Sequence, residues 1–334
     1  MPAATAPSAA AGRRTLAVLL LIPVVAALAL AVFAWPAARI APRDLPIGVA
    51  GPATAADAVA EKLGRHEGAF DIHRYPDGDA ARAAIEDRDV YGAVVITPGG
   101  TELLTASAGS PVVAGLLREA VTAQAPAGAV TVTDVVAAPA GDPRGAVLGA
   151  SLLPLALAGA ATGIVTVLLG LRGARAAGVL VGASALAGLV GAALADSWLG
   201  ALAGDWWAEA GVLGLTVLAI GAAFAGLATL LGKPGFGLGA ALTILLGNAF
   251  SGMSSAPELL PTGVGALGQW LPPGAGGSAL RSVSAFDGAA AGGPLLVLAL
   301  WAAAGLTATA LGARRRRAEA APAADGAPVP VPVG

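Results

Sequence analysis

Charged residues are missing from six long stretches of this chain and are confined to the segments between them. The stretches are 15–35, 145–171, 176–195, 210–231, 236–253 and 294–313, and none of them contains Asp, Glu, Lys, Arg or His. A helix needs about 20 apolar residues to cross the hydrocarbon core of a bilayer. The pattern therefore predicts a polytopic α-helical membrane protein with six transmembrane helices and the lipid bilayer as its solvent.

Composition agrees with this prediction. The chain is 56% hydrophobic and 12% charged, with a mean hydropathy of +0.77, whereas soluble domains carry about 25% charged residues. It holds 48 glycines, and small residues let membrane helices approach closely. Four glycine pairs have the spacing of such contacts, and each is either a helix contact or a chance product of an Ala/Gly-rich sequence: Gly145/Gly149, Gly159/Gly163, Gly178/Gly182 and Gly235/Gly239.

The basic residues predict the orientation of the spans, because short segments rich in Lys and Arg stay in the cytoplasm. These residues flank the spans on one side only: Arg13 and Arg14, Arg172 and Arg175, Lys233, and Arg314 to Arg317. The segment 196–209 on the other side carries three acids and three tryptophans but no base. Both termini are therefore predicted to be cytoplasmic.

The two chain ends are predicted to be tails. Residues 1–14 are expected to form a disordered cytoplasmic tail before the first span, and 314–334, rich in Ala and Pro, a second one. A cleaved signal peptide is the rival interpretation of residues 1–40, but signal sequences usually have apolar runs of about 7–15 residues, so an uncleaved anchor is favoured. With 17 Arg against 2 Lys and abundant Ala, Gly and Pro, the sequence indicates a G+C-rich bacterial genome and hence the bacterial plasma membrane.

The only long polar segment, 36–144, is predicted to be a small extracytoplasmic α/β domain between the first and second helices. Short apolar runs alternate with helical patterns there. Strands are expected at 45–50, 70–74, 91–97, 102–106 and 130–136, and helices at 55–63, 79–86 and 112–124. Pro98, Gly99 and Gly100 predict a hairpin turn between the third and fourth strands.

The sequence gives no sign of an enzyme. His66 and His73 are the only histidines, cysteine is absent, and no cluster of metal ligands or nucleophile motif is present, so no catalytic, cofactor or metal site is predicted. The spans lack the ionisable groups of ion-coupled pumps. Near Lys233 the phosphate-binding loop pattern fails, because Pro234 replaces its Ser/Thr. An enzyme of lipid-linked substrates would have only three acids to use: Asp196, Asp205 and Glu209.

The most polar stretch of the membrane part is 248–255, NAFSGMSS, at the end of the fifth predicted span. Asn248 either faces a pathway or bonds to a neighbouring helix. The segment 254–292 that follows is rich in Pro and Gly and carries only three charges, Glu258, Arg281 and Asp287. It predicts either short broken helices dipping into the outer half of the membrane or a plain outer loop.

One span, a large outer domain and five more spans (the five-helix domain 145–313) resemble the type-2 ABC exporter permeases with an inserted extracellular domain, and the related phage-infection-protein family. Two segments carry the likeness locally: IEDRDVYGAVVITPGG, 85–100, and the stretch from FSGMSSAPELLP to LGQWLPPGAGGSALR, 250–281. The resemblance implies a permease unit that works as a homodimer or heterodimer and is driven by a separate cytoplasmic ATPase.

The leading hypothesis is a permease subunit that exports an unknown amphipathic or envelope substrate, without enzymatic activity and without a nucleic-acid partner. Its candidate outer gate is a set of polar residues: Asn248, Ser251, Ser254, Ser255 and Arg281. The alternative is a non-transporting membrane protein, like the phage-infection proteins, whose outer domain binds an envelope partner. The lack of an amphipathic helix in 1–12 and the short connection 171–176 favour this alternative.

Overall fold

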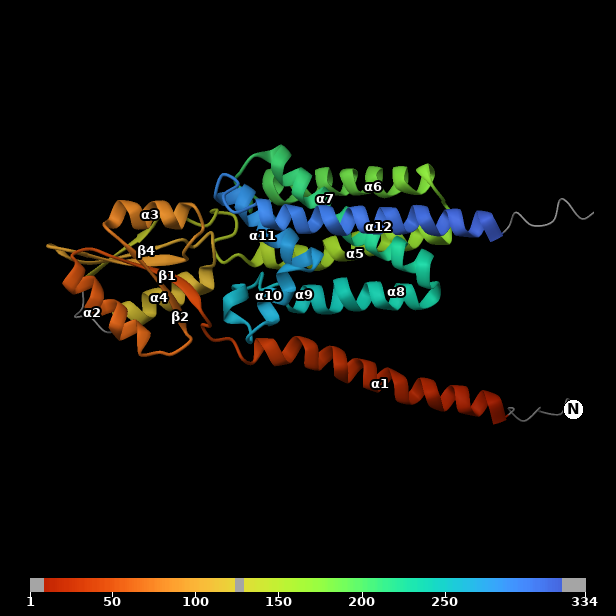
Figure 1. Cartoon of the computed structure of the whole chain (residues 1–334), viewed down its shortest axis with the longest axis horizontal. Coiled ribbons are helices and arrows are strands. Elements are labelled where there is room, and N and C mark those ends of the chain that lie inside the picture. Colours follow the sequence, from red (N-terminus) through yellow and green to blue (C-terminus); the bar gives the residue numbers. More distant parts are fainter. Residues whose placement is uncertain (1–8, 124–128, 320–334) are drawn as a thin grey trace, which may run out of the picture.

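The computed structural model describes residues 9–123 and 129–319, which form an α/β domain at one end of a bundle of long helices (Figure 1). We call the end of the bundle next to this domain the domain end and the opposite end the distal end. The first helix begins and the last helix finishes at the distal end (Figure 1). The α/β domain and both outermost helix ends therefore lie at opposite ends of the bundle.

The described residues contain five helices that are long and apolar enough to cross a membrane. They are α1 (Ala9–Ala37), α5 (Ala146–Leu168), α6 (Ala174–Ala192) with its continuation η1 (Ala193–Trp198), α7 (Trp206–Leu231) and α12 (Gly292–Glu319). Outside α7, which is mostly buried, many of their apolar side chains are exposed, for example Leu30 at 70% and Leu168 at 73%. Lipid is the environment that suits such surfaces, so the chain is a polytopic, membrane-embedded protein.

The fifth predicted span, 236–253, differs from the prediction. The structure has a shorter helical run there, composed of α8 (Lys233–Gly239), the π-helical η2 (Ala240–Leu246) and α9 (Gly247–Ala249). At 1.5 Å per residue it measures at most about 25 Å, whereas a hydrocarbon core is about 30 Å thick. The run ends at Ala249, where Phe250 leaves helical geometry, and Gly252, at φ +68°, follows in the turn after it. Six spans thus remain a prediction.

The outermost helices are longer than their apolar stretches. Helix α1 begins at Ala9, within the predicted tail 1–14, and α12 continues to Glu319, beyond the predicted start of the second tail at 314. The remaining parts of those two predicted tails, 1–8 and 320–334, lie outside the described residues.

Helix α7 is the centre of the bundle and packs against α5, α6, α11 and α12. Glycine makes the closest of these contacts. A Cβ added at Gly163 of α5 would lie 2.3 Å from the backbone oxygen of Gly221 in α7, and one at Gly159 would lie 2.8 Å from Cβ of Ile220. Since real Cβ contacts are longer, only glycine permits this approach.

The four predicted glycine pairs have different roles. Gly159/Gly163 makes the contact with α7, and in Gly235/Gly239 the first member touches the Leu227 backbone while the second faces Phe224. Around Gly178 and Gly182, by contrast, no atom lies within 4 Å of an added Cβ. Gly145 has a φ of +64° and precedes α5, and Gly149 has only ordinary van der Waals neighbours. The four-residue spacing of glycines thus coincides with close helix packing in two of the four pairs.

The predicted α/β domain is present, with a five-stranded sheet in the order β2-β1-β3-β4-β5. The strands are β1 (Leu45–Ala50), β2 (Phe70–Tyr75), β3 (Gly92–Thr97), β4 (Gly100–Thr105) and β5 (Val130–Asp134). All neighbours are parallel except β3 and β4, which form the predicted hairpin around Pro98 and Gly99, with Thr97 opposite Gly100. The helices are α2 (Ala53–Gly64), α3 (Gly78–Glu86) and α4 (Pro111–Thr122).

The segment after α9 forms short helices, and their predicted position in the outer half of the membrane stays a prediction. They are η3 (Pro257–Leu259), α10 (Val264–Gln269) and α11 (Pro272–Ala285), and they lie between the bundle and the α/β domain (Figure 1). Side chains from this segment complete the apolar core of the domain. Phe286 packs with Ile85 and Val90, and Leu259 packs with Ile47 and Val94. The two parts therefore share their cores and hold each other in a fixed arrangement.

Candidate functional site

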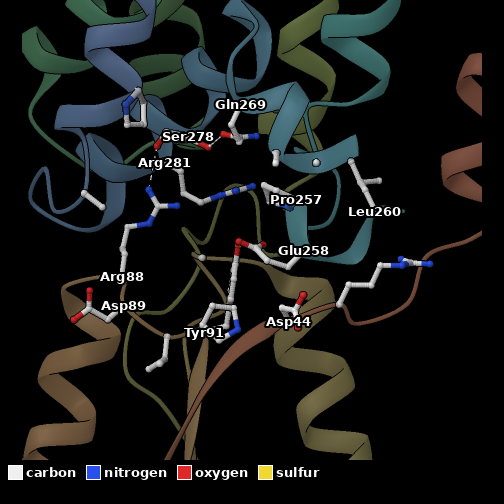
Figure 2. Close-up of a pocket in the computed structure, with 18 of the residues that line it drawn as sticks. Asp44, Arg88, Asp89, Tyr91, Pro257, Glu258, Leu260, Gln269, Ser278 and Arg281 are labelled. Carbon is white, nitrogen blue, oxygen red and sulfur yellow. Dashed lines mark hydrogen bonds between the residues drawn. The ribbon is translucent and has the colours of Figure 1, made fainter. Parts of the chain in front are cut away.

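A cavity of about 480 Å³ lies between the α/β domain and the short helices, and we call it the interdomain cavity (Figure 2). Its volume falls within the range of about 300–1,000 Å³ that is typical of small-molecule sites. One wall comes from the turn after α3 and the start of β3, and the other from η3, α10 and α11. Most of the exposed surface of its lining is apolar, and six charged residues lie among the lining: Arg43, Asp44, Arg88, Asp89, Glu258 and Arg281.

Tyr91 and Glu258 connect the two walls. The Tyr91 hydroxyl, just before β3, donates a hydrogen bond of 2.8 Å to Oε2 of Glu258 in η3. Hydrogen bonds to an ionised acceptor are roughly twice as strong as neutral ones. Burial, and next the Glu258 carboxylate, raise the pKa of Tyr91, so the phenol stays protonated and remains a donor.

Arg88 reaches from the α/β domain to α11. Its Nη1 donates to the backbone oxygen of Ser278 at 3.1 Å and to the hydroxyl of Ser282. Its guanidinium also lies over the Phe286 ring, 5.3 Å from the centroid, a distance typical of a cation–π contact. Burial lowers the pKa of Arg88, and the nearby Tyr91 and Glu258 act in the opposite direction.

Arg281, on α11, is the most buried charge in the cavity wall, with 3% of its surface exposed. Its Nη2 donates to the backbone oxygen of Met253 at 3.1 Å, while its Nε is buried without a partner. The ion pairs within 4.0 Å among the described residues do not include Arg281. Burial lowers its pKa to about 10, which still leaves it cationic at neutral pH. A buried charge without a counter-ion is costly.

Backbone strain is concentrated around the same cavity. Four residues other than glycine have positive φ in the described part of the chain, and three of them, Asp44, Arg88 and Ala290, line the cavity. Arg88, at φ +65°, follows the C-cap of α3, where the Asp89 N–H bonds to the Ala84 oxygen. Glycine normally takes this position, and a side chain there costs about 1 kcal/mol. The fold keeps Arg88 despite that cost.

The five predicted gate residues do not form one group. Asn248, Ser251, Ser254 and Ser255 line a second cavity of about 210 Å³, whose other lining includes Phe33 and Pro36 of α1. Arg281 lies instead on the interdomain cavity. Ser251 accepts from the Met253 N–H and donates to the Asn248 oxygen, so it holds the local turn. The Asn248 side-chain amide bonds to no neighbouring helix among the described residues.

Sequence reasoning found Arg281 but missed its neighbours. Arg88 stands inside the run Glu86, Asp87, Arg88, Asp89, which has the composition of a solvated helix end. A single basic residue within an acidic run is the one feature of the sequence that could have marked Arg88 as a site residue. Tyr91 and Glu258 are 167 positions apart, and only the packing of the domain against the short helices brings them together.

The three acids that a lipid-linked enzyme would use have structural roles. Asp205 accepts from the Ala208 N–H and caps α7, and Glu209 accepts from the Gly204 N–H. Asp196 accepts from the neighbouring Ser197 hydroxyl. No group of three potential metal ligands exists among residues 9–123 and 129–319. Helix capping explains Asp205, whereas Glu209 is fully buried and its Oε2 has no hydrogen-bond partner among the described residues.

Comparisons with known proteins identify no relative of this chain. No protein-family model matches it, and neither curated proteins nor solved structures give a match. Its function is therefore inferred from the arrangement of its own residues.

Proposed function

We propose that this chain is a permease subunit of the bacterial plasma membrane that exports an amphipathic or envelope substrate. In this proposal both termini are cytoplasmic, the α/β domain is outside, and the run 233–249 is the sixth, short span. Two copies, or one copy with a relative, line the path, and a separate cytoplasmic ATPase drives transport, as the resemblance to type-2 ABC exporters implies.

The observation that carries the proposal is the polar cavity beside α1. Asn248 is half-buried among apolar helices, and within the described part of the chain its amide makes no hydrogen bond to a neighbouring helix. A polar group in such surroundings is costly unless it is paired or faces a water-filled path. The cavity that it lines is bordered on one side by α1, which stands apart from the bundle (Figure 1).

The packing of the bundle supports a path between chains. Gly159 and Gly163 of α5 pack closely against α7. Helix α7 carries no charged residue beyond its first turn. The close contact between α5 and α7 thus contains no charged side chain. Helix α1, in contrast, has most of its apolar surface exposed, and a second chain packed against this side would place Asn248 and Ser254 within the assembly.

One observation favours the alternative, a non-transporting protein whose outer domain binds an envelope partner. The distal connections are very short: residues 169–173 join α5 to α6, and Gly232 alone joins α7 to α8. These short connections offer little surface to which an ATPase could bind. If no ATPase binds the distal end, the interdomain cavity and the α/β domain become the working parts of the protein.

Site-directed crosslinking separates the two functions, since the chain has no cysteine. Arg172→Cys and Lys233→Cys place single thiols at the distal end, and Glu61→Cys on exposed α2 is the matched control in the α/β domain. The proposal expects stoichiometric capture of an ATPase from the first two positions, none from the third, and ATP turnover altered by the permease. Failure of both distal positions to capture an ATPase, with the protein intact in its native membrane, would overturn it in favour of the envelope-binding function.

A further inference from the structure

Arg281 has an unusual electrostatic position, because the fold buries its guanidinium and leaves part of it without a partner. Only 3% of the residue is exposed, and among the described residues its Nε has no hydrogen bond and no carboxylate lies within 4.0 Å of its guanidinium nitrogens. Guanidinium groups supply planar forks of N–H donors that fit the oxygens of phosphates and carboxylates. A ligand with such oxygens would satisfy this group.

The charges of the cavity favour an anion. Three cations line it, Arg43, Arg88 and Arg281, together with one half-buried anion, Glu258, whose Oε2 already accepts from Tyr91. Asp44 and Asp89 also line the cavity, but both are exposed to solvent, where water screens their charge. Among the half-buried and buried side chains of the lining, positive charges therefore outnumber negative ones. Figure 2 shows Arg88 reaching up from the α/β domain and Arg281 along the opposite wall, with Glu258 beside them.

The rest of the lining favours a ligand with an apolar part. Leu260, Phe286 and Ile85 are buried side chains of the wall, and five prolines or alanines add further apolar surface: Pro46, Pro257, Pro261, Ala266 and Pro294. A site with a few convergent polar groups in an apolar wall suits an amphipathic molecule. The cavity also lies where the spanning helices meet the α/β domain, so lipid head groups are within reach.

We propose that the interdomain cavity binds the phosphate group of an amphipathic anion, held between Arg88 and Arg281 with its apolar part against Leu260 and Phe286. Two sources share this chemistry, namely the head group of an anionic phospholipid and a free phosphate. The inference goes beyond the proposed function, because it requires neither an ATPase nor transport. It holds equally for a permease and for an envelope-binding protein.

The test measures binding to the purified full chain in an uncharged detergent. The probes are dihexanoyl phosphatidylglycerol, inorganic phosphate and, as a zwitterionic comparison, dihexanoyl phosphatidylcholine; calorimetry gives the Kd, and tryptophan fluorescence on heating gives the Tm. Saturable binding of phosphatidylglycerol, tighter than that of phosphatidylcholine, identifies the lipid as the source. Saturable binding of inorganic phosphate that phosphatidylglycerol does not displace identifies free phosphate.

Three variants test the residues. Arg281→Met and Arg88→Gly should each weaken the Kd at least roughly tenfold, the usual effect of losing a charge-assisted hydrogen bond, whereas Arg118→Gln on exposed α4 should leave it unchanged. The Arg88→Gly variant is expected to fold, because glycine suits the φ of +65° at that position. Absence of saturable binding for both anionic probes, or equal weakening by Arg118→Gln, would overturn the proposal. Neither result bears on the crosslinking of an ATPase.

Discussion

Gly163→Ala is the substitution that tests most directly how the bundle is held together. In the structure, α5 and α7 approach so closely at this point that an added Cβ would lie 2.3 Å from the Gly221 oxygen and 2.7 Å from Cβ of Phe224. The first of these atoms belongs to the backbone, so it moves only if the whole helix moves. The substitution must therefore push the two helices apart.

The magnitude follows from two opposing effects. Extra methyl groups in a well-packed interior cost about 1–3 kcal/mol, because separated helices lose much of their dispersion energy. Alanine is favoured over glycine within a helix by up to about 1 kcal/mol. Since the clash involves backbone atoms, we expect the first effect to prevail, with a net loss of about 1–2 kcal/mol in the free energy of unfolding.

Gly182→Ala is the matched control, because Gly182 belongs to a predicted pair with the same spacing but has no atom within 4 Å of an added Cβ. It should leave stability unchanged or raise it by up to about 1 kcal/mol. Unfolding in detergent by increasing denaturant, followed through the fluorescence of the six tryptophans, measures both variants. Equal effects of Gly163→Ala and Gly182→Ala would refute the close α5–α7 contact.

Three further predictions concern other parts of the chain. Asp142→Ala should destabilise the protein by about 2 kcal/mol in the same unfolding assay, because this buried carboxylate accepts from three backbone N–H groups at the start of α5; an unchanged midpoint would contradict it. The two tyrosines, Tyr75 and Tyr91, both have raised pKa values, so phenolate absorbance should appear above pH 10 in the folded protein but near pH 10 after unfolding. Their raised pKa contributes stability that is complete below pH 10 and declines as the pH rises further; ionisation of both at pH 10 while folded would count against the geometry. A membrane-impermeant maleimide applied to whole cells should label Glu61→Cys but not Lys233→Cys, and the reverse pattern would invert the proposed orientation.

Much of the fold could be predicted because its signals are local. The five long helices follow from uninterrupted apolar stretches, and the strands and helices of the α/β domain follow from periodicity and from the turn at Pro98–Gly99. The run 233–249 ends before the apolar stretch 236–253 does, so the sixth span stays a prediction. Residue spacing alone also could not distinguish Gly163 from Gly182, since only a neighbouring helix makes one of them indispensable.

For the candidate site, too, some features follow from the sequence alone and others only from the tertiary structure. The sequence by itself determined that this is a polytopic membrane protein with an inserted α/β domain, because hydropathy and side-chain period are properties of each segment. The tertiary structure decided that Arg88 and Tyr91 from the domain meet Glu258 and Arg281 from the short helices around one cavity. Such a meeting depends on long-range packing, here on Phe286 and Leu259 completing the core of the domain. No local pattern encodes which distant surfaces share a core, and so only the folded chain could reveal where its buried charge lies.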